Sequence, residues 1–341
     1  MAIDNSFLVQ KVQHQESLIA AFCGLTNMPF AVCDPETYND QVWVFEEEQY
    51  LQEFAKPYTE KKVPLRGITF KNSQFLGFFS SLYTMGINEV VFVGASGTTK
   101  IELENLVTRP NMEKVPESQR PIENPPLQLT GMYFLQEFGR PVPNEEKQNL
   151  RQLDEEFSVN LARARYIVAI QPKEGPGSVI EKIQKREYSM PIVTLKNGDA
   201  YQPLFTDMLE FTKFKGKADL QAIGVPFSAL KNLMVKTAKG FMLNPAGFHI
   251  LMQPALLDAV DKNFPDAVKS GEEHAKKLAE EMGHLAASQA AARAAHKAPS
   301  AKPQAAPDKV SVPFVNAPLS NEQAKKISSK ITSMPSSSKK V

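Results

Sequence analysis

The stretch of sequence that decides the fold is Phe241-Met242-Leu243-Asn244-Pro245-Ala246-Gly247, an apolar strand followed by a turn. At an offset of 150 residues it lies, without gaps, over Val91-Phe92-Val93-Gly94-Ala95-Ser96-Gly97. Both runs place three apolar residues before a turn that contains glycine. The match predicts that the chain carries the same strand and turn twice.

Further matches lie upstream of these two stretches, at slightly larger offsets. Phe45 and Phe54 match Phe205 and Phe214 at an offset of 160. The changes in offset fall between predicted elements, where insertions are tolerated. We therefore predict that the chain contains two tandem copies of one fold.

The pattern of strands and helices predicts an α+β fold, with two tandem mixed-sheet α/β domains followed by an Ala-rich helix and a disordered tail. The predicted linker carries five prolines, which remove backbone donors and keep the chain extended. In chain order we predict a divergent copy (1–109), a Pro-rich linker (110–127), a clearer copy (128–264), an Ala-rich amphipathic helix (265–298) and a disordered basic tail (299–341).

Two helix starts illustrate how the elements are predicted. At the beginning of the chain Asp4 can cap a helix, and Leu8, Val12, Ile19 and Phe22 recur on one face of a helical pattern. In the second copy, Thr206 and Asp207 are predicted to cap a helix that runs through Phe214.

Charge is divided unevenly along the chain. Residues 291–341 hold nine Lys or Arg and two Asp or Glu, whereas residues 1–290 hold 30 basic and 36 acidic residues, so the net charges are +7 and −6. A tail of this composition cannot bury enough apolar surface to fold, and we expect it to bind polyanions weakly. The acidic body shows no basic face, so we expect no sequence-specific binding of nucleic acid.

Several features of the sequence indicate its compartment. The chain begins Met1-Ala2-Ile3-Asp4-Asn5-Ser6, without the basic and apolar regions of a secretory signal. No apolar run approaches the ~18 residues of a membrane span. Two cysteines, Cys23 and Cys33, are too few for a disulfide scaffold or a cysteine-based zinc module. We therefore expect a cytoplasmic protein with free thiols and no membrane partner.

No group of residues predicts a reaction. Ser96 follows a strong strand, where a nucleophile elbow would lie, but the elbow needs glycine at the position of Thr98, and the second copy has Ala246 in place of the serine. Glu281 and His284 could share a helix face, but a carboxylate–histidine metal site needs a second such pair facing it. We therefore expect no catalytic residue, no metal and no cofactor.

The two turns are the positions at which binding remains a hypothesis, and they contain Gly94 and Gly97 in the first copy and Asn244, Pro245, Gly247 and His249 in the second. Because Asn244 precedes proline, we expect it to be extended, with its side chain bonded to the backbone two residues on. Gly247 should then supply a positive φ where the chain re-enters a strand. These residues explain a hairpin without any ligand.

The motif residues of the second copy are Gly240–Gly247, Leu251, Pro254 and Leu257, with the strand-to-helix entry Gln202–Asp207 upstream. They resemble the SseB-like family (enhanced serine sensitivity protein SseB, amino-terminal domain) over about residues 144–260. The first copy resembles the family more faintly, because Gly94-Ala95 replaces Asn-Pro. The resemblance implies a cytosolic, bacterial α/β module for which no reaction is established, and it lends no catalytic residue.

Because the two copies share apolar spacing and turns rather than acids, bases or ligands, we expect a non-catalytic binding or interaction protein. We expect its partner to be a protein, with a second copy of this chain as one alternative. The competing hypothesis is an enzyme or small-molecule sensor with its site in the cleft between the two domains.

Overall fold

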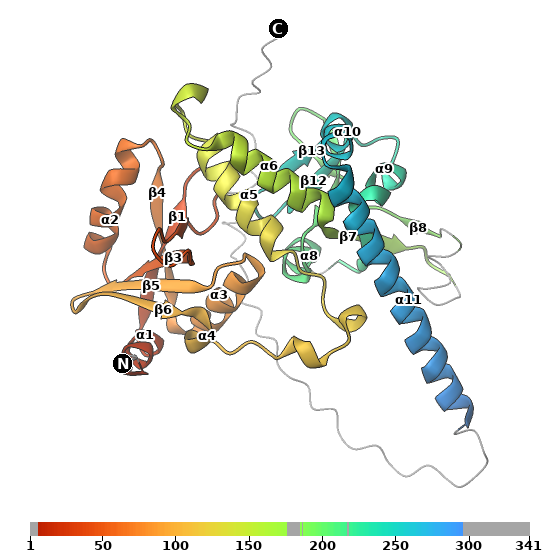
Figure 1. Ribbon diagram of the computed structural model, residues 1–341, viewed down its shortest axis with the longest axis horizontal. Helices are drawn as coiled ribbons and strands as arrows, with labels where there is room; N and C mark the ends of the chain where they lie inside the picture. The colour runs from red at the N-terminus through yellow and green to blue at the C-terminus, as the bar shows by residue number, and fades with distance from the viewer. Residues whose placement is uncertain (1–5, 176–184, 186, 217, 296–341) are drawn as a thin grey trace.

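The computed structural model describes residues 6–175, 185, 187–216 and 218–295 of the 341-residue chain. Two mixed β-sheets, each with helices packed against it, make up the body of the protein (Figure 1). The predicted α+β fold with two mixed sheets is therefore confirmed. The predicted disordered tail, residues 299–341, lies outside the described residues, and so does Asp4, the predicted helix cap.

The first sheet has the strand order β4-β1-β3-β5-β6, and β2 pairs with β3. β3 and β5 run parallel, whereas the other pairs run antiparallel. The strands are β1 (Ser17–Cys23), β2 (Ala31–Cys33), β3 (Asp40–Phe45), β4 (Leu65–Lys71), β5 (Glu89–Gly94) and β6 (Gly97–Glu102).

The helices of this half cover both faces of its sheet, and they are α1 (Ser6–Gln13), α2 (Glu48–Glu60), α3 (Asn72–Thr84) and α4 (Leu103–Leu106). Along β1, Leu18 and Ala20 belong to the core that includes α3, whereas Ala21 and Cys23 pack in a separate core with Leu51 of α2. Successive side chains of a strand point to opposite faces, so β1 is apolar on both sides because both sides are covered.

The predicted helix at the beginning of the chain is correct only as far as Gln13, where α1 ends. The pattern predicts Ile19 and Phe22 on the same helix face as Val12, but both residues lie in β1. This prediction is wrong because β1 pairs along its whole length with β4 and also with β3. Those long-range hydrogen bonds and the burial of both faces outweigh the local pattern.

The second sheet has the strand order β11-β7-β10-β12-β13, with β8 paired to β7 and β9 paired to β10. β10 and β12 run parallel, and the remaining pairs run antiparallel. The strands are β7 (Arg165–Pro172), β8 (Tyr188–Ser189), β9 (Val193–Thr194), β10 (Ala200–Phe205), β11 (Gln221–Pro226), β12 (Phe241–Leu243) and β13 (Ile250–Met252).

The helices that accompany the second sheet are α6 (Leu150–Arg163), α8 (Met208–Lys215), α9 (Leu230–Leu233), α10 (Pro254–Asn263) and α11 (Pro265–Ala295). α11 begins against the body and projects beyond it at its C-terminal end (Figure 1). Ala267 and Leu278 of α11 are buried, whereas Met282 is 47% exposed, and α11 contacts α6 among other elements. No helix of the described residues is both long enough and apolar enough to span a bilayer.

The two sheets have the same strand order and the same relative strand directions. In each, the central strand and its neighbour form the parallel pair, β3 with β5 and β10 with β12. The register refines the match read from the sequence. Val44 pairs with Phe92 and Leu204 pairs with Leu243, so aligning Val44 on Leu204 places Phe92 on Leu243, an offset of 151 rather than 150.

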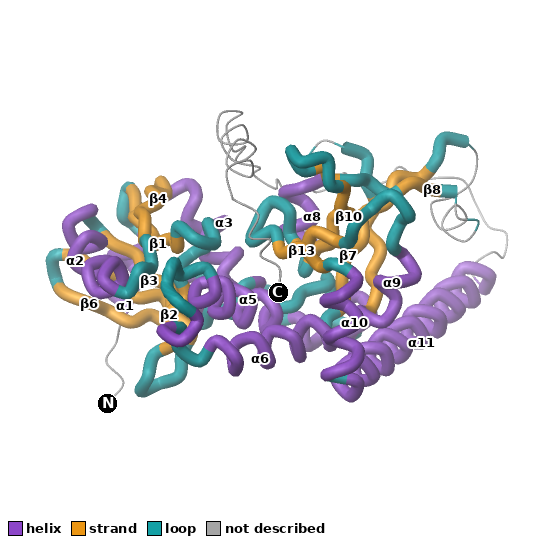
Figure 2. The backbone as a smooth tube through the Cα atoms, turned by 90° about the horizontal axis from the view of Figure 1, so that it is seen from above, coloured by secondary structure: helices purple, strands orange, loops and turns teal. Residues whose placement is uncertain are grey.

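A further helix, α5 (Pro125–Phe138), lies between the two sheets in both views (Figures 1 and 2). Residues 110–127, predicted as a linker, contain two short 3-10 helices (Met112–Lys114 and Glu117–Gln119), and the last of these residues begin α5. One hydrophobic core runs through the joint, since residues of α3, α5 and α6 belong to the same buried cluster. The two halves therefore pack as one body.

Candidate functional site

The turn of the first half is a tight hairpin between β5 and β6. Gly94 pairs with Gly97, whose φ of 102° only glycine adopts without strain. A Cβ at Gly94 would meet the end of the Glu46 side chain and would lie 2.8 Å from the Phe92 ring, so the small size of glycine also suits this position. The Ser96 hydroxyl accepts a hydrogen bond from the Lys11 ammonium at 3.2 Å. These contacts describe a structural turn.

The turn of the second half differs from the expectation. Asn244 has a φ of 47°, not an extended conformation, and Gly247 is not among the glycines with positive φ. His249, with a φ of 40°, supplies the second left-handed residue, and its Nδ1 lies 3.2 Å from the Gly247 carbonyl oxygen. The predicted conformations of Asn244 and Gly247 are therefore wrong.

Tertiary hydrogen bonds hold Asn244 in this conformation. Its side-chain oxygen accepts from Thr206 N, and its side-chain amide donates to Thr206 Oγ1, both at 2.9 Å. Its backbone N–H donates to the Leu204 carbonyl, and its own carbonyl accepts from Gly247 and His249. Asparagine tolerates the left-handed region better than most residues, so these bonds outweigh the preference set by Pro245.

Asp207 lies at the centre of the same cluster and begins α8, as predicted. Its Oδ1 accepts from the backbone N–H groups of Leu209 and Glu210 at 2.8 and 3.0 Å, which caps the helix. Its Oδ2 accepts from Thr206 Oγ1 and from Gln128 Nε2, each at 2.6 Å. All four acceptor directions of this buried carboxylate are used inside the protein.

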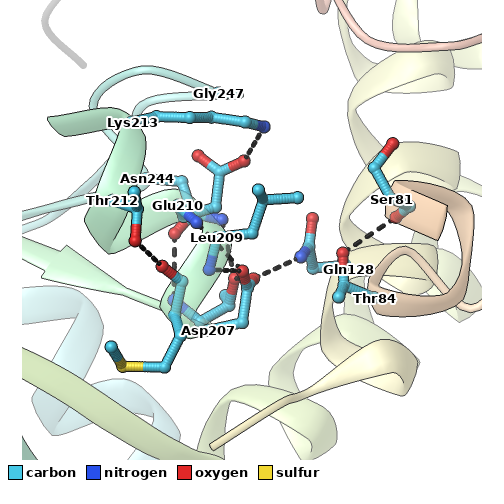
Figure 3. Close-up of polar contacts among 12 residues, drawn as sticks. Ser81, Thr84, Gln128, Asp207, Leu209, Glu210, Thr212, Lys213, Asn244 and Gly247 are labelled. Atoms are coloured by element: carbon cyan, nitrogen blue, oxygen red, sulfur yellow. Dashed lines mark hydrogen bonds and ion pairs between the residues drawn. The ribbon is translucent and has the colours of Figure 1, made fainter. Parts of the chain in front are cut away.

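Two side chains of the cluster, Glu210 and Gln128, each keep one buried oxygen without a hydrogen-bond partner among the described residues. Glu210 is 1% exposed, and its Oε1 receives an ion pair from Lys213 at 2.6 Å. Among the residues that the structure describes, its Oε2 has no hydrogen-bond partner, and it lies so close to Gly247 that a Cβ there would be 2.9 Å away. Burial raises the pKa of Glu210, Lys213 opposes that shift, and Asp207 adds to it. Figure 3 shows these residues together with Gln128.

The position of this cluster is one at which open α/β sheets bind ligands. Thr206 follows β10 and Asn244 follows β12, so both lie at the carboxyl ends of the parallel pair. However, the polar groups of Thr206 and Asn244 form hydrogen bonds with each other instead of facing an open space. Within the described residues, no group of three or more His, Cys, Asp or Glu side chains is placed to hold a metal ion. The cluster therefore fixes the turn and the start of α8.

Polar side chains of α5 bind both halves of the protein. At its N-terminal end, Asn124 bonds to backbone groups of Arg165 and Thr206, and Gln128 binds Asp207. Nearer its C-terminal end, the Gln136 amide donates to the Ala31 carbonyl and accepts from the Ala31 N–H, both at 3.0 Å. Gln136 thus bonds to β2 as a neighbouring strand would.

A second contact between α5 and the first sheet is the hydrogen bond from the Tyr133 hydroxyl to Asp40 Oδ1, at 2.7 Å. It joins a polar network in which Asp34 accepts from Gln41 and Lys100, and Glu89 accepts from Gln41 and Asn39. The hydrogen bond from Lys100 is the largest cause that holds the pKa of Asp34 well below its usual range. Every carboxylate of this network has partners within it.

Beside the far end of α5 the surface is hollowed into a groove of about 670 Å³. We call it the α5–α6 groove, and it is lined by Phe134, Phe138, Asn144, Lys147, Asn149, Leu150, Arg151 and Asp154. Phe138 is 54% exposed and stacks on Phe134 at a centroid distance of 5.3 Å, and Phe134 stacks on Phe157 at 5.5 Å. The Lys147 ammonium lies 5.0 Å from the Phe138 ring centroid.

Part of the chain has a known family likeness. Residues 146–259 match the SseB protein N-terminal domain. The match covers about a third of the chain and includes α6, the second sheet and the Asn244 turn. The predicted resemblance is confirmed for this SseB-like segment.

Other comparisons add little to the family match. No curated protein matches the chain. Two solved structures are similar to it. Anabaena Tic22, described as a protein of protein transport, is 10% identical over 76% of this chain and 98% of that chain, with a TM-score of 0.17. Tic22 from Plasmodium falciparum is 13% identical over 75% of this chain and 96% of that chain, with a TM-score of 0.16. At these TM-scores, neither likeness carries an argument.

Sequence reasoning missed the residues that connect the SseB-like segment to the first half. Gln128 and Gln136 lie on a helix, where glutamine is common on exposed faces, and nothing local distinguishes them. Glu210 follows Asp207 by three residues and looks like an ordinary acidic residue of a first helical turn. For the α5–α6 groove the sequence does carry a signal. It is Phe138, an aromatic residue directly before the glycine that ends α5.

Proposed function

We propose that the chain is a non-catalytic interaction protein built from two tandem SseB-like modules, residues 1–109 and 128–264, that binds a protein partner. The duplication is supported by the common strand order and directions of the two sheets. Residues 146–259, which match the family, lie within the second of these modules.

The observation that carries the binding function is the exposed aromatic ring of Phe138 in the α5–α6 groove. The Phe138 ring stacks on Phe134, which in turn stacks on Phe157. Because the ring is already held in place, it loses little conformational freedom on binding. Aromatic residues held in place beside cationic side chains are typical centres of binding energy in protein interfaces. Lys147 and Arg151 supply such neighbours.

The state of the buried polar groups supports binding over catalysis. A catalytic carboxylate needs access to substrate, whereas Asp207 has its acceptor directions filled and is 1% exposed. The joint between the halves, where the competing hypothesis places a cleft, is packed with the apolar side chains of α5. The α5–α6 groove is therefore the better candidate surface.

The test compares Phe138→Ser with Leu76→Ser, since Leu76 is also a large exposed apolar residue, at 70%, but lies on α3. Tagged wild-type protein and both variants would be used for quantitative affinity capture from cells that express the gene. We expect at least one partner to be lost with Phe138→Ser and kept with Leu76→Ser, while circular dichroism shows all three folded. Equal capture by all three proteins would contradict the proposal.

One observation favours a second function, that of a small-molecule sensor. Within the described part of the chain, Glu210 Oε2 is a buried acceptor without a partner, which is the kind of group a ligand amine or hydroxyl satisfies. A thermal-shift screen of primary amines and polyols would test it. A sensor predicts a compound that raises the melting temperature of the wild type but not of Glu210→Gln.

A further inference from the structure

We propose that the free edge of β4 pairs with β4 of a second copy of this chain, so that the first sheets of two molecules join into one continuous sheet. The proposal goes beyond the proposed function, because this surface shares no residue with the α5–α6 groove. Among the described residues β4 pairs only with β1, and Figure 2 shows it at the margin of the first half.

Two hydrogen bonds at the ends of β4 establish which of its backbone groups face outward. Just after the strand, Asn72 N donates to the Glu16 carbonyl at 2.8 Å, and just before it the Pro64 carbonyl accepts from Gly24 N at 2.7 Å. In an antiparallel pair hydrogen-bonded residues alternate with residues that are not, so positions 66, 68 and 70 bond to β1. The residues whose backbone groups point away from β1 are therefore Leu65, Gly67, Thr69 and Lys71.

The outward groups at the middle of β4 are open to solvent. Gly67 is exposed, and because glycine has no side chain, the exposed surface is backbone. Thr69 is exposed as well. Within the described part of the chain, no group bonds to the outward side of either residue, whereas the Lys71 N–H donates to Gln74 Oε1. An unpaired row of this kind is a template for another strand.

The other edges of the two sheets are less suited to pairing. β11 has the position of β4 in the second sheet, but it ends in Pro226, which lacks an N–H, and α11 contacts it. At the opposite edges, β13 has three residues, and the single large apolar side chain of β6, Ile101, is buried. β4 has seven residues and leaves three apolar side chains half-buried, Leu65, Ile68 and Phe70.

The side chains of β4 are self-complementary in the antiparallel register centred on Ile68. In that register Ile68 lies opposite Ile68 of the second copy, and Arg66 lies opposite Phe70. Lys71 lies opposite Leu65, so no two like charges face each other. Pairing would also cover the three half-buried apolar side chains. This complementarity favours a second copy as the occupant of the edge.

The same register satisfies the open backbone groups. Gly67 and Thr69 of one molecule exchange N–H to carbonyl hydrogen bonds with Thr69 and Gly67 of the other. The seven residues of β4 span about 23 Å, which is short for a protein interface, so we expect a weak dimer that forms as the concentration rises.

The experiment is sedimentation equilibrium of the full-length chain from about 2 to about 200 µM, the range for a small interface. Thr69→Pro removes an outward N–H and leaves the hydrogen bonds between β1 and β4 in place, and proline is tolerated at such edge positions. The matched control is Thr98→Pro on β6. Thr98 N also faces outward, because the bond from Leu103 N to the Asn88 carbonyl sets the alternation there. Wild type and Thr98→Pro should form dimers, whereas Thr69→Pro should stay monomeric while circular dichroism shows it folded.

A disulfide crosslink tests the register and does not depend on the folding of the proline variant. Ile68→Cys is made together with Cys33→Ser, since Cys33 is exposed and Cys23 is buried. Directly opposite residues that are not hydrogen-bonded have Cα atoms about 4.5 Å apart, which is within disulfide range. Under mild oxidation Ile68→Cys should give several-fold more covalent dimer than Thr98→Cys in the same background.

The outcomes that overturn the inference are distinct from those that overturn the proposed function. A wild type that is monomeric throughout, a folded Thr69→Pro that still forms dimers, or equal crosslinking from positions 68 and 98 would each overturn it. Phe138→Ser should leave the dimer unchanged, and loss of the dimer in that variant would place the contact in the groove instead. If Phe138→Ser loses a partner and no dimer forms, the proposed function stands and this inference fails. If the dimer depends on β4 and no partner depends on Phe138, the reverse holds.

Discussion

Replacing Gln136 by alanine tests whether α5 holds the first sheet to the rest of the protein. The Gln136 amide is the hydrogen-bond partner of both backbone groups of Ala31, and Ala31 is 2% exposed. A buried polar group left without a partner costs about 1–3 kcal/mol, so Gln136→Ala should lower the free energy of unfolding by at least about 2 kcal/mol.

The assay is equilibrium unfolding in urea, followed by tryptophan fluorescence and by far-UV circular dichroism. The single tryptophan, Trp43, lies in β3 and stacks on Phe54 at 4.5 Å, so its emission reports the first sheet. With a slope near 3 kcal/mol per molar urea, a loss of 2 kcal/mol moves the midpoint down by about 0.7 M.

The control is Gln152→Ala, which removes a glutamine from an exposed helix face of α6 and should change the stability by less than about 0.5 kcal/mol. If Gln136→Ala shifts the midpoint no more than Gln152→Ala, the amide does not hold β2, and the account of α5 is refuted.

Three further predictions concern the turns and the cluster around Asp207. Gly240→Ala should lower the melting temperature, because its Cβ would clash with the Met252 carbonyl oxygen and such overpacking costs about 1–3 kcal/mol. The control Gly77→Ala lies at an exposed position of α3 with open space around it. It should raise the melting temperature, because alanine loses about 0.5–1 kcal/mol less backbone entropy than glycine on folding. Asp207→Ala removes the cap of α8 and the partner of Gln128, so urea unfolding should show a loss of at least about 2 kcal/mol; a loss within error would show that the cluster does not stabilise the fold. Because the pKa of Glu210 is raised in the folded protein, folding takes up a proton between the unfolded and folded pKa values, and stability falls as pH rises through that window. The stability of the wild type relative to Glu210→Gln should therefore decrease from about pH 4 to pH 7 in thermal melts, and a constant difference would contradict the shift.

The sequence predicted those parts of the fold whose signals are local. β5 and β12 are short apolar runs that end in turns, and Asp207 has the residue type and position of a helix cap. The proposed repeat has a local signal because strands in corresponding positions of the two sheets carry matching apolar residues, and the strand register changes the offset from 150 to 151.

The parts that the sequence could not predict depend on distant partners. β1 has an apolar run that fits a helix as well as a strand, and only its pairing with β3 and β4 decides between them. The partners of Gln128 and Gln136 are 79 and 105 residues away in the sequence, so no local pattern marks these glutamines as the residues that join the two halves.

The seating of α5 also limits how the protein can move. Gln128 is anchored in the second half and Gln136 in the first, about two turns apart on one rigid rod, so neither half can swing without breaking buried hydrogen bonds. Hinge closure at the joint, the usual means by which two-lobed proteins close on a ligand, would therefore have to break these hydrogen bonds. Binding of a partner to either half is therefore not expected to reorient the two halves relative to each other.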